Sequence, residues 1–158
     1  TKLKYRKFLN RNFNKPIQPG HVIAQMLGAD ILGFKEFFEI HHYPHIVDRK
    51  TLSEYFLTQP ELLETQIKFK FRSVDQVNPI TLMNHLKIQK NQANLQPDID
   101  LAYLKNEQSV DAFLHAVNHP EIKYGCIQSL DQLDGMAAER IVHVMNDKFK
   151  GFLPNSIQ

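Results

Sequence analysis

Three histidines of this chain lie close together in the sequence and have the chemistry of metal ligands, although on a turn only two of them could readily face one ion. His41, His42 and His45 fall within five positions, with one acidic residue two positions before them and another three positions after. Neutral imidazole binds transition metals such as zinc or iron, and a nearby carboxylate can complete or orient such a ligand set. The stretch therefore makes a transition-metal site one hypothesis for this protein.

A second pair of histidines has helical spacing. His115 and His119 are four residues apart on a predicted helix, so both rings would project from one face of that helix. If the fold brought this pair to the first cluster, three or four ligands could surround one ion. The chain has no HExxH motif, so this helix lacks the general base of a zinc protease. The alternative is that all five are surface and turn histidines that bind backbone carbonyls.

Two short segments resemble the half-motifs of the PD-(D/E)xK nucleases: Pro97-Asp98, and Glu121, Ile122 and Lys123. The resemblance implies that Asp98 and Glu121 hold magnesium, while Lys123 steadies the attacking water or the scissile phosphate. A helix is predicted between the two segments, where that family has paired strands. The alternative is a turn acid and an ion pair at the start of a strand.

Positive charge is concentrated at the start of the chain. The formal net charge is +2, yet the first fifteen residues carry six basic side chains and no acid, which leaves a net charge of −4 on the rest. Such asymmetry is typical of a segment that meets nucleic acid or an acidic partner.

Two predicted elements carry basic side chains on one face. Residues 1–15 have the periodicity of an amphipathic helix, and the strict alternation of residues 67–72 (IKFKFR) predicts a strand with one basic face. The leading hypothesis is a non-enzymatic binding or assembly module for nucleic acid or an acidic protein partner. A metal-dependent hydrolase or nuclease is the alternative, and a merely solubilising surface is the plainest interpretation. The candidate contact residues are Lys4, Lys7, Arg11, Lys15, Lys68, Lys70 and Arg72.

The other elements follow from periodicity and capping residues. An apolar stripe covers residues 21–40, with Gly28 and Gly33 as close-packing points or a break. Capping patterns predict short helices over 51–58 and 60–65, and Asn78-Pro79 predicts the start of another. The remaining expectations are strands over 98–104 and 121–128, a helix around 110–117, and a last helix after Asp134-Gly135.

These elements predict an α+β fold, with a helical N-terminal third followed by a small sheet of about three strands packed against helices. We expect a basic arm over 1–18 and a single domain over 19–158, because 158 residues is a usual domain size. No apolar run is long enough to cross a bilayer. The single cysteine, Cys126, favours a reducing compartment, so a cytoplasmic location is expected.

Overall fold

The computed structural model describes the backbone of residues 5–7 and the whole of residues 20–71, 73 and 75–150. Contacts within the chain divide it into two compact units, which are described separately below. The first unit comprises Thr1–His41 and His45–Asp98, and the second comprises His42–Pro44 and Ile99–Gln158. The prediction of one domain over 19–158 stays a prediction.

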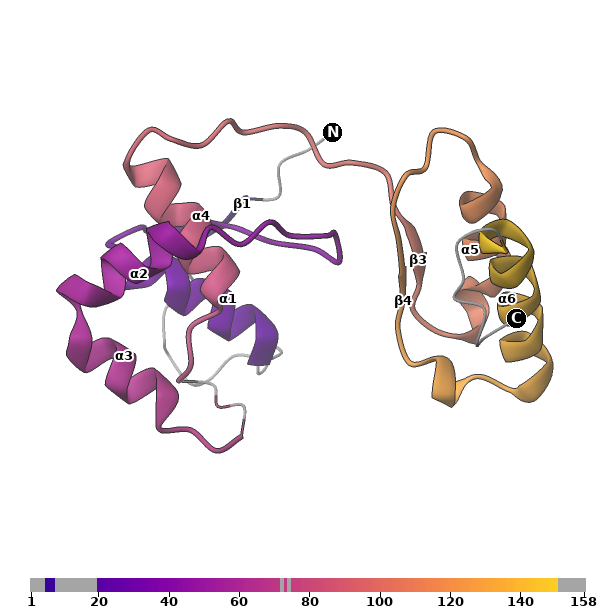
Figure 1. Ribbon diagram of the computed structural model, residues 1–158, viewed down its shortest axis with the longest axis horizontal. Helices are drawn as coiled ribbons and strands as arrows, with labels where there is room; N and C mark the ends of the chain where they lie inside the picture. The colour runs from indigo at the N-terminus through magenta and orange to yellow at the C-terminus, as the bar shows by residue number, and fades with distance from the viewer. Residues whose placement is uncertain (1–4, 8–19, 72, 74, 151–158) are drawn as a thin grey trace. The chain divides into compact units, whose positions relative to one another are not determined.

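The described part of the chain is a mixed α+β structure that is mostly helical, as expected (Figure 1). The first unit contains β1 (Tyr5–Lys7), α1 (Gly20–Asp30), β2 (Glu36–Phe38), α2 (Arg49–Thr58), α3 (Pro60–Ile67) and α4 (Pro79–Gln89). The second contains β3 (Ala102–Leu104), the 3-10 helix η1 (Glu107–Ser109), α5 (Val110–Asn118), β4 (Gly125–Ile127), the 3-10 helix η2 (Leu130–Gln132) and α6 (Gly135–Phe149).

Helices α1 and α4 pack closely in the first unit because Gly28 lacks a side chain. A methyl group at Gly28 would lie 3.0 Å from the backbone nitrogen of Leu82 and 3.1 Å from the carbonyl oxygen of Asn78. The Asn78 amide also donates to the Ala24 carbonyl of α1, at 2.8 Å. The prediction of Gly28 as a close-packing point is confirmed.

The apolar stripe that begins in α1 breaks where the sequence indicated. Gly33 has a φ of +81°, a conformation that favours glycine, and the chain then enters β2. The side chain of Phe37 in β2 is fully buried, and β2 pairs antiparallel with β1. Past β2, the buried side chain of Gln25 accepts a hydrogen bond from the Ile40 amide at 2.8 Å, which fixes the segment beside α1.

Helix α2 is capped by an acid that precedes the expected start. Asp48, and not Thr51, is the N-cap: its carboxylate accepts from the Thr51 amide at 3.1 Å and from the Thr51 hydroxyl at 2.9 Å. The ammonium group of Lys87 in α4 lies 2.8 Å from Oδ2 of Asp48, the oxygen that also accepts from the Thr51 hydroxyl, and ties α2 to α4. These bonds hold the pKa of Asp48 well below its ordinary value, with the Lys87 hydrogen bond as the largest cause.

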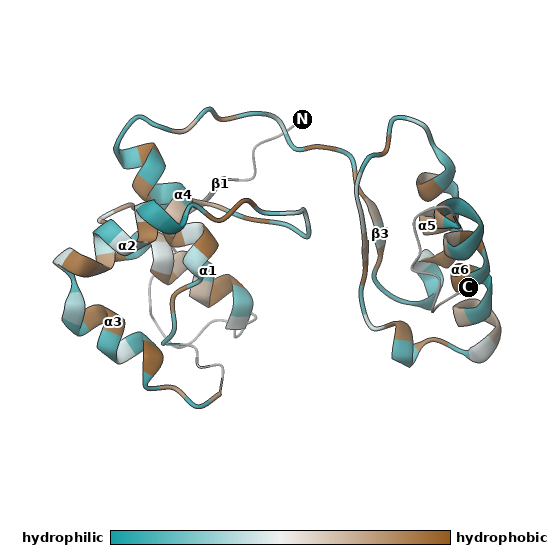
Figure 2. Cartoon of the chain, viewed as in Figure 1, coloured by the Kyte–Doolittle hydropathy of each residue, from teal (hydrophilic) through white to brown (hydrophobic). Residues whose placement is uncertain are grey.

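The second unit is built on a parallel strand pair. Residue Tyr103 of β3 is opposite Cys126 of β4, and α5 connects the two strands. Figure 2 shows hydrophobic and hydrophilic residues alternating around α6, as its sequence predicts. The core of the second unit is formed by Ala102, Leu104, Val110, Phe113, Val117, Ala137 and Ile141.

Three expectations about strands and helices need correction. The described strands form two separate pairs, and not one sheet of about three strands. The expected strand over 67–72 is wrong, because Ile67 is the last residue of α3 and residues 68–71 form a turn and a bend. The helix expected over 1–15 is not confirmed: Tyr5–Lys7 form β1, and the other residues of that segment lie outside the described part of the chain.

Within the described ranges, none of the helices combines the length and the apolar content that a membrane-spanning helix needs. The cytoplasmic location stays a prediction.

Candidate nucleic-acid interface

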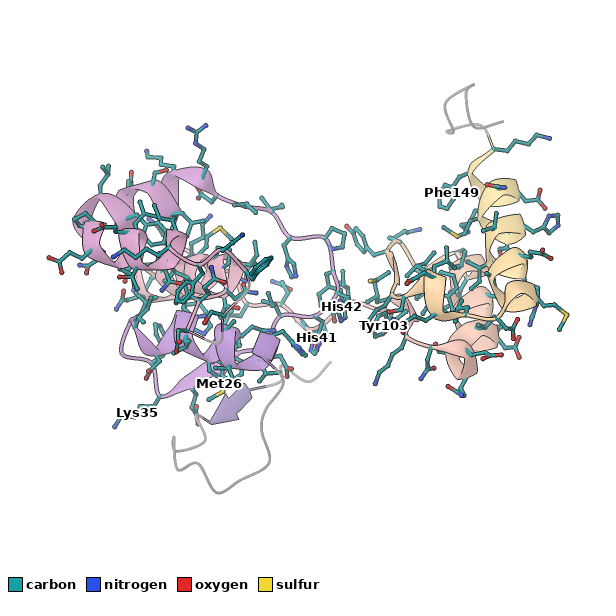
Figure 3. All side chains as sticks on the ribbon, turned by 90° about the horizontal axis from the view of Figure 1, so that it is seen from below. Met26, Lys35, His41, His42, Tyr103 and Phe149 are labelled. Carbon is teal, nitrogen blue, oxygen red and sulfur yellow. The ribbon has the colours of Figure 1, made fainter. Side chains whose placement is uncertain are left out.

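The histidines of the first cluster make local contacts. His45 donates from Nε2 to the carbonyl oxygen of His41 at 2.9 Å, which closes the turn around Pro44. His42 belongs to the second unit, where its ring stacks on Tyr103 with centroids 4.7 Å apart and an interplanar angle of 24° (Figure 3). These contacts match the interpretation of the stretch as a polar turn.

The second histidine pair also has local partners. His115 is exposed in the last turn of α5, and His119 is the C-cap, where its Nδ1 accepts from the Glu121 amide at 3.3 Å. Across residues 20–71, 73 and 75–150, no three side chains of His, Cys, Asp or Glu come together as a metal ion requires. The predicted histidine site for zinc or iron therefore has no support in the described residues.

The residues of the nuclease-like half-motifs belong to different units of the chain. Asp98 belongs to the first unit, whereas Glu121 and Lys123 belong to the second. Glu121 lies in a turn, because β4 begins at Gly125, and Lys123 donates to the carbonyl oxygen of Pro120 at 2.6 Å. The catalytic assignment and its magnesium stay untested predictions.

The basic candidates of the N-terminal segment are only partly described. Lys7 lies in β1, where the backbone alone is described, and β1 pairs with β2 of the first unit. Lys4, Arg11, Lys15 and Arg72 lie outside the described residues.

Lys68 and Lys70 are placed differently from the expectation, on a turn instead of a strand. We call residues 68–71 (Lys-Phe-Lys-Phe) the basic-aromatic loop. Its Phe71 side chain is 78% exposed, and the ammonium group of Lys70 lies 5.6 Å from the centre of the Phe71 ring. This is the range of a cation–π contact. Lys68 lies 3.9 Å from Glu64 one helical turn earlier, so part of its charge is balanced.

Two glutamines hold the base of the basic-aromatic loop. The side chain of Gln66 accepts from the Val77 amide at 2.8 Å, while Gln76 donates to the Gln66 carbonyl at 3.1 Å. Gln76 also accepts from the Ser73 amide at 3.0 Å. Because the two bonds made by Gln66 join residues ten and eleven positions apart, they fix the base of the loop in a folded shape.

The loop borders a pocket of about 490 Å³ in the first unit. Phe56 of α2 contributes to its wall, together with Phe69, Lys70 and Phe71 of the loop, and His21 of α1 lies on the same pocket. None of the described residues that line it is acidic. Flat aromatic rings beside a positive group and an open pocket are suited to an unpaired base and its phosphate.

Sequence reasoning missed a fully buried histidine of the first unit. His85 of α4 is 0% exposed, and its Nε2 accepts from the Phe38 amide at 3.2 Å. Its Nδ1 lies 2.8 Å from the Thr81 carbonyl, so Nδ1 carries the proton and the ring is neutral. Burial lowers the pKa of His85 below the ordinary value of 6.5. In the sequence, the burial of His85 was indicated by its position three residues after Leu82, on the apolar face of α4.

Comparison of the chain with protein-family models, with curated proteins and with solved structures finds no match.

Proposed function

We propose that this protein is a non-enzymatic binding module that contacts single-stranded nucleic acid through the basic-aromatic loop and the basic first fifteen residues. The observation that carries the proposal is the exposed Phe71 ring beside the Lys70 ammonium, at the border of a pocket without acidic lining. Stacking of a base on an aromatic ring and attraction of a lysine to phosphate are the two contributions that bind single strands without sequence preference.

The arrangement favours nucleic acid over an acidic protein surface. A protein partner would need to bury Phe71 in a hydrophobic pocket of its own, whereas a nucleobase needs only the face of the ring. The fixed loop base also supports the proposal, because a binding group that is already positioned loses less conformational entropy when it binds. An acidic protein remains the alternative partner, and the experiment below separates the two.

The test is fluorescence anisotropy of a labelled oligo-dT strand titrated with the full chain at low and at physiological salt. We expect binding that weakens as salt increases, and Lys70→Ala should weaken it further. Lys50→Ala is the matched control, because Lys50 is an exposed lysine of α2 (84% exposed side chain) paired at 3.8 Å with Glu54. The proposal is wrong if the strand does not bind at low salt while an acidic polypeptide such as polyglutamate does, or if the two variants bind alike.

A further inference from the structure

The second unit contains a smaller pocket that has no part in the proposed function. Its volume is about 290 Å³, and it lies between the β3–β4 pair and the helices α5 and α6. Apolar side chains form most of its wall, among them Phe113, Ile122, Met145 and Phe149. Figure 3 labels Phe149 near the C-terminal end of α6.

Several apolar side chains around this pocket are open to solvent. Tyr124, Ile127 and Phe149 are 44%, 37% and 38% exposed, and all three line it. The core of the unit, by contrast, is closed around Phe113 and Ile141, each 1% exposed. The pocket is thus an accessible extension of the core, of the kind that an apolar ligand can enter.

The charged groups in the described lining of the pocket are two lysines, which both bond to carbonyl oxygens near the C-terminal end of α5. The Lys148 ammonium donates to the Val117 carbonyl at 2.5 Å, and the Lys123 ammonium donates to the Pro120 carbonyl at 2.6 Å. Val117 is in the last turn of α5 and Pro120 follows the helix, so both ammonium groups lie where that helix ends. Each ammonium has three donor hydrogens, and one bond to a carbonyl leaves two for a ligand.

Charge complementarity then defines the occupant. None of the described residues that line this pocket is acidic, so its two lysines are not balanced by a carboxylate in the lining. An anion with an apolar body would place its charge beside Lys123 and Lys148 and its body against Phe113, Ile122 and Met145. The volume lies near the lower end of the roughly 300–1,000 Å³ typical of ligand pockets, which favours a small ligand.

We propose that this pocket binds a small apolar carboxylic acid, of about the size of octanoate, with the carboxylate held by Lys123 and Lys148. The ligand enters between β4 and α6. Its binding does not affect the basic-aromatic loop of the first unit. The inference is independent of the proposed function, since all of its residues lie in the second unit.

The test is calorimetric titration of the full chain with sodium octanoate, and with 1-octanol as the uncharged match. Octanoate should bind more tightly than octanol, and Lys148→Gln should weaken octanoate binding by about tenfold, as expected for loss of a charge-assisted hydrogen bond. Lys105→Gln is the control, because Lys105 is an exposed lysine of the same unit that does not line the pocket.

A second variant keeps the test decisive if Lys148→Gln impairs folding. A side chain at Gly125 would start 3.6 Å from the Ala102 carbonyl oxygen, an ordinary contact distance, so Gly125→Val should fold and fill the pocket. It should abolish octanoate binding while Phe71→Ala leaves that binding unchanged. Undiminished binding to folded Gly125→Val, equal affinity for octanoate and octanol, or no binding to the wild-type chain would overturn the inference.

Discussion

Single buried residues decide the packing of the first unit. His85 links α4 to β2, because its two ring nitrogens bind the Thr81 carbonyl and the Phe38 amide. The bond from the Phe38 amide depends on a neutral ring, since a protonated Nε2 cannot accept from an amide. Gly28 acts through the absence of a side chain, which lets α1 approach the backbone of α4.

The His85 contacts predict a pH dependence of stability. The pKa of His85 is lowered in the folded protein from an ordinary value of 6.5, so the unfolded chain binds a proton more readily. The His85 contribution to the free energy of unfolding is therefore complete above about pH 6.5 and is lost as the pH falls below it.

In denaturant titrations at pH 8 and pH 5, the His85→Gln variant should show a smaller difference between the two pH values than the wild type. His143→Gln is the control, because that histidine side chain is 78% exposed. An equal pH dependence in the wild type and in His85→Gln would contradict this assignment of the buried ring.

Gly28→Ala should destabilise the protein although alanine is the better helix former. Helix propensity alone would favour alanine by about 0.5–1 kcal/mol. The added methyl would meet backbone atoms at 3.0 and 3.1 Å, and overpacking of this kind costs about 1–3 kcal/mol.

The free energy of unfolding of Gly28→Ala should thus fall, as measured by urea denaturation. Gly135→Ala is the matched control, because a methyl at Gly135 has nothing within 4 Å and should be neutral or stabilising. A Gly28→Ala variant more stable than the wild type would show that α1 can move away from α4.

The helices that combine a regular spacing of apolar residues with a clear N-cap residue could be predicted from the sequence. Asn78 caps α4 through bonds of 3.0 Å to the Ile80 and Thr81 amides, and Asp134 caps α6 through a 2.7 Å bond to Ala137, as the sequence indicated. The N-terminal limit of α2 was misplaced, because Thr51 resembles a cap but donates its hydroxyl to the true cap, Asp48.

The segment after α3 could not be predicted from its alternation. A two-residue period indicates a strand only if the apolar side is buried, yet Ile67 and Phe71 are 70% and 78% exposed. The bonds between Gln66 and residues 76–77 decide its shape, and a polar pair ten residues apart has no periodic signal. The sequence therefore predicted Lys70 as a contact residue, but it did not predict the pocket beside Lys70.

Gln66→Ala should loosen the basic-aromatic loop. The variant removes the acceptor of the Val77 amide, and loss of such a hydrogen bond costs about 0.5–1.5 kcal/mol. Hydrogen exchange of the Val77 amide should accelerate accordingly in NMR measurements. Gln59→Ala is the control, since Gln59 precedes α3 without a side-chain cap bond. Unchanged exchange at Val77 in Gln66→Ala would mean that the loop keeps its shape without this bond.

For the whole molecule, the distribution of charge is the main link between sequence and function. The first fifteen residues carry six of the nineteen basic side chains, while the net charge is only +2. An acidic ligand such as nucleic acid would therefore meet attraction at the N-terminal segment and at the basic-aromatic loop, against a net negative charge summed over the rest of the chain, so binding should depend on local contacts and on salt.

Neutralising Lys4, Arg11 and Lys15 together with glutamine should lower the salt dependence of oligo-dT binding. Each phosphate contact contributes about 0.7 to the slope of log K against log salt for a single strand, so three lost contacts should reduce the slope by about 2. Substitution is preferable to deletion of residues 1–15, because Tyr5–Lys7 form β1. A slope equal to that of the wild type would exclude these three residues from the contact.

The most direct test of the proposed function is the affinity of Phe71→Ala for the same oligo-dT strand at low salt. Phe71 is 78% exposed, so the substitution should leave stability unchanged, while the loss of one stacked base should weaken binding by about fivefold or more. Leu57→Ala, which removes an 81% exposed apolar side chain from α2, should bind like the wild type. Equal affinities of all three proteins would contradict the account of the basic-aromatic loop as a nucleic-acid interface.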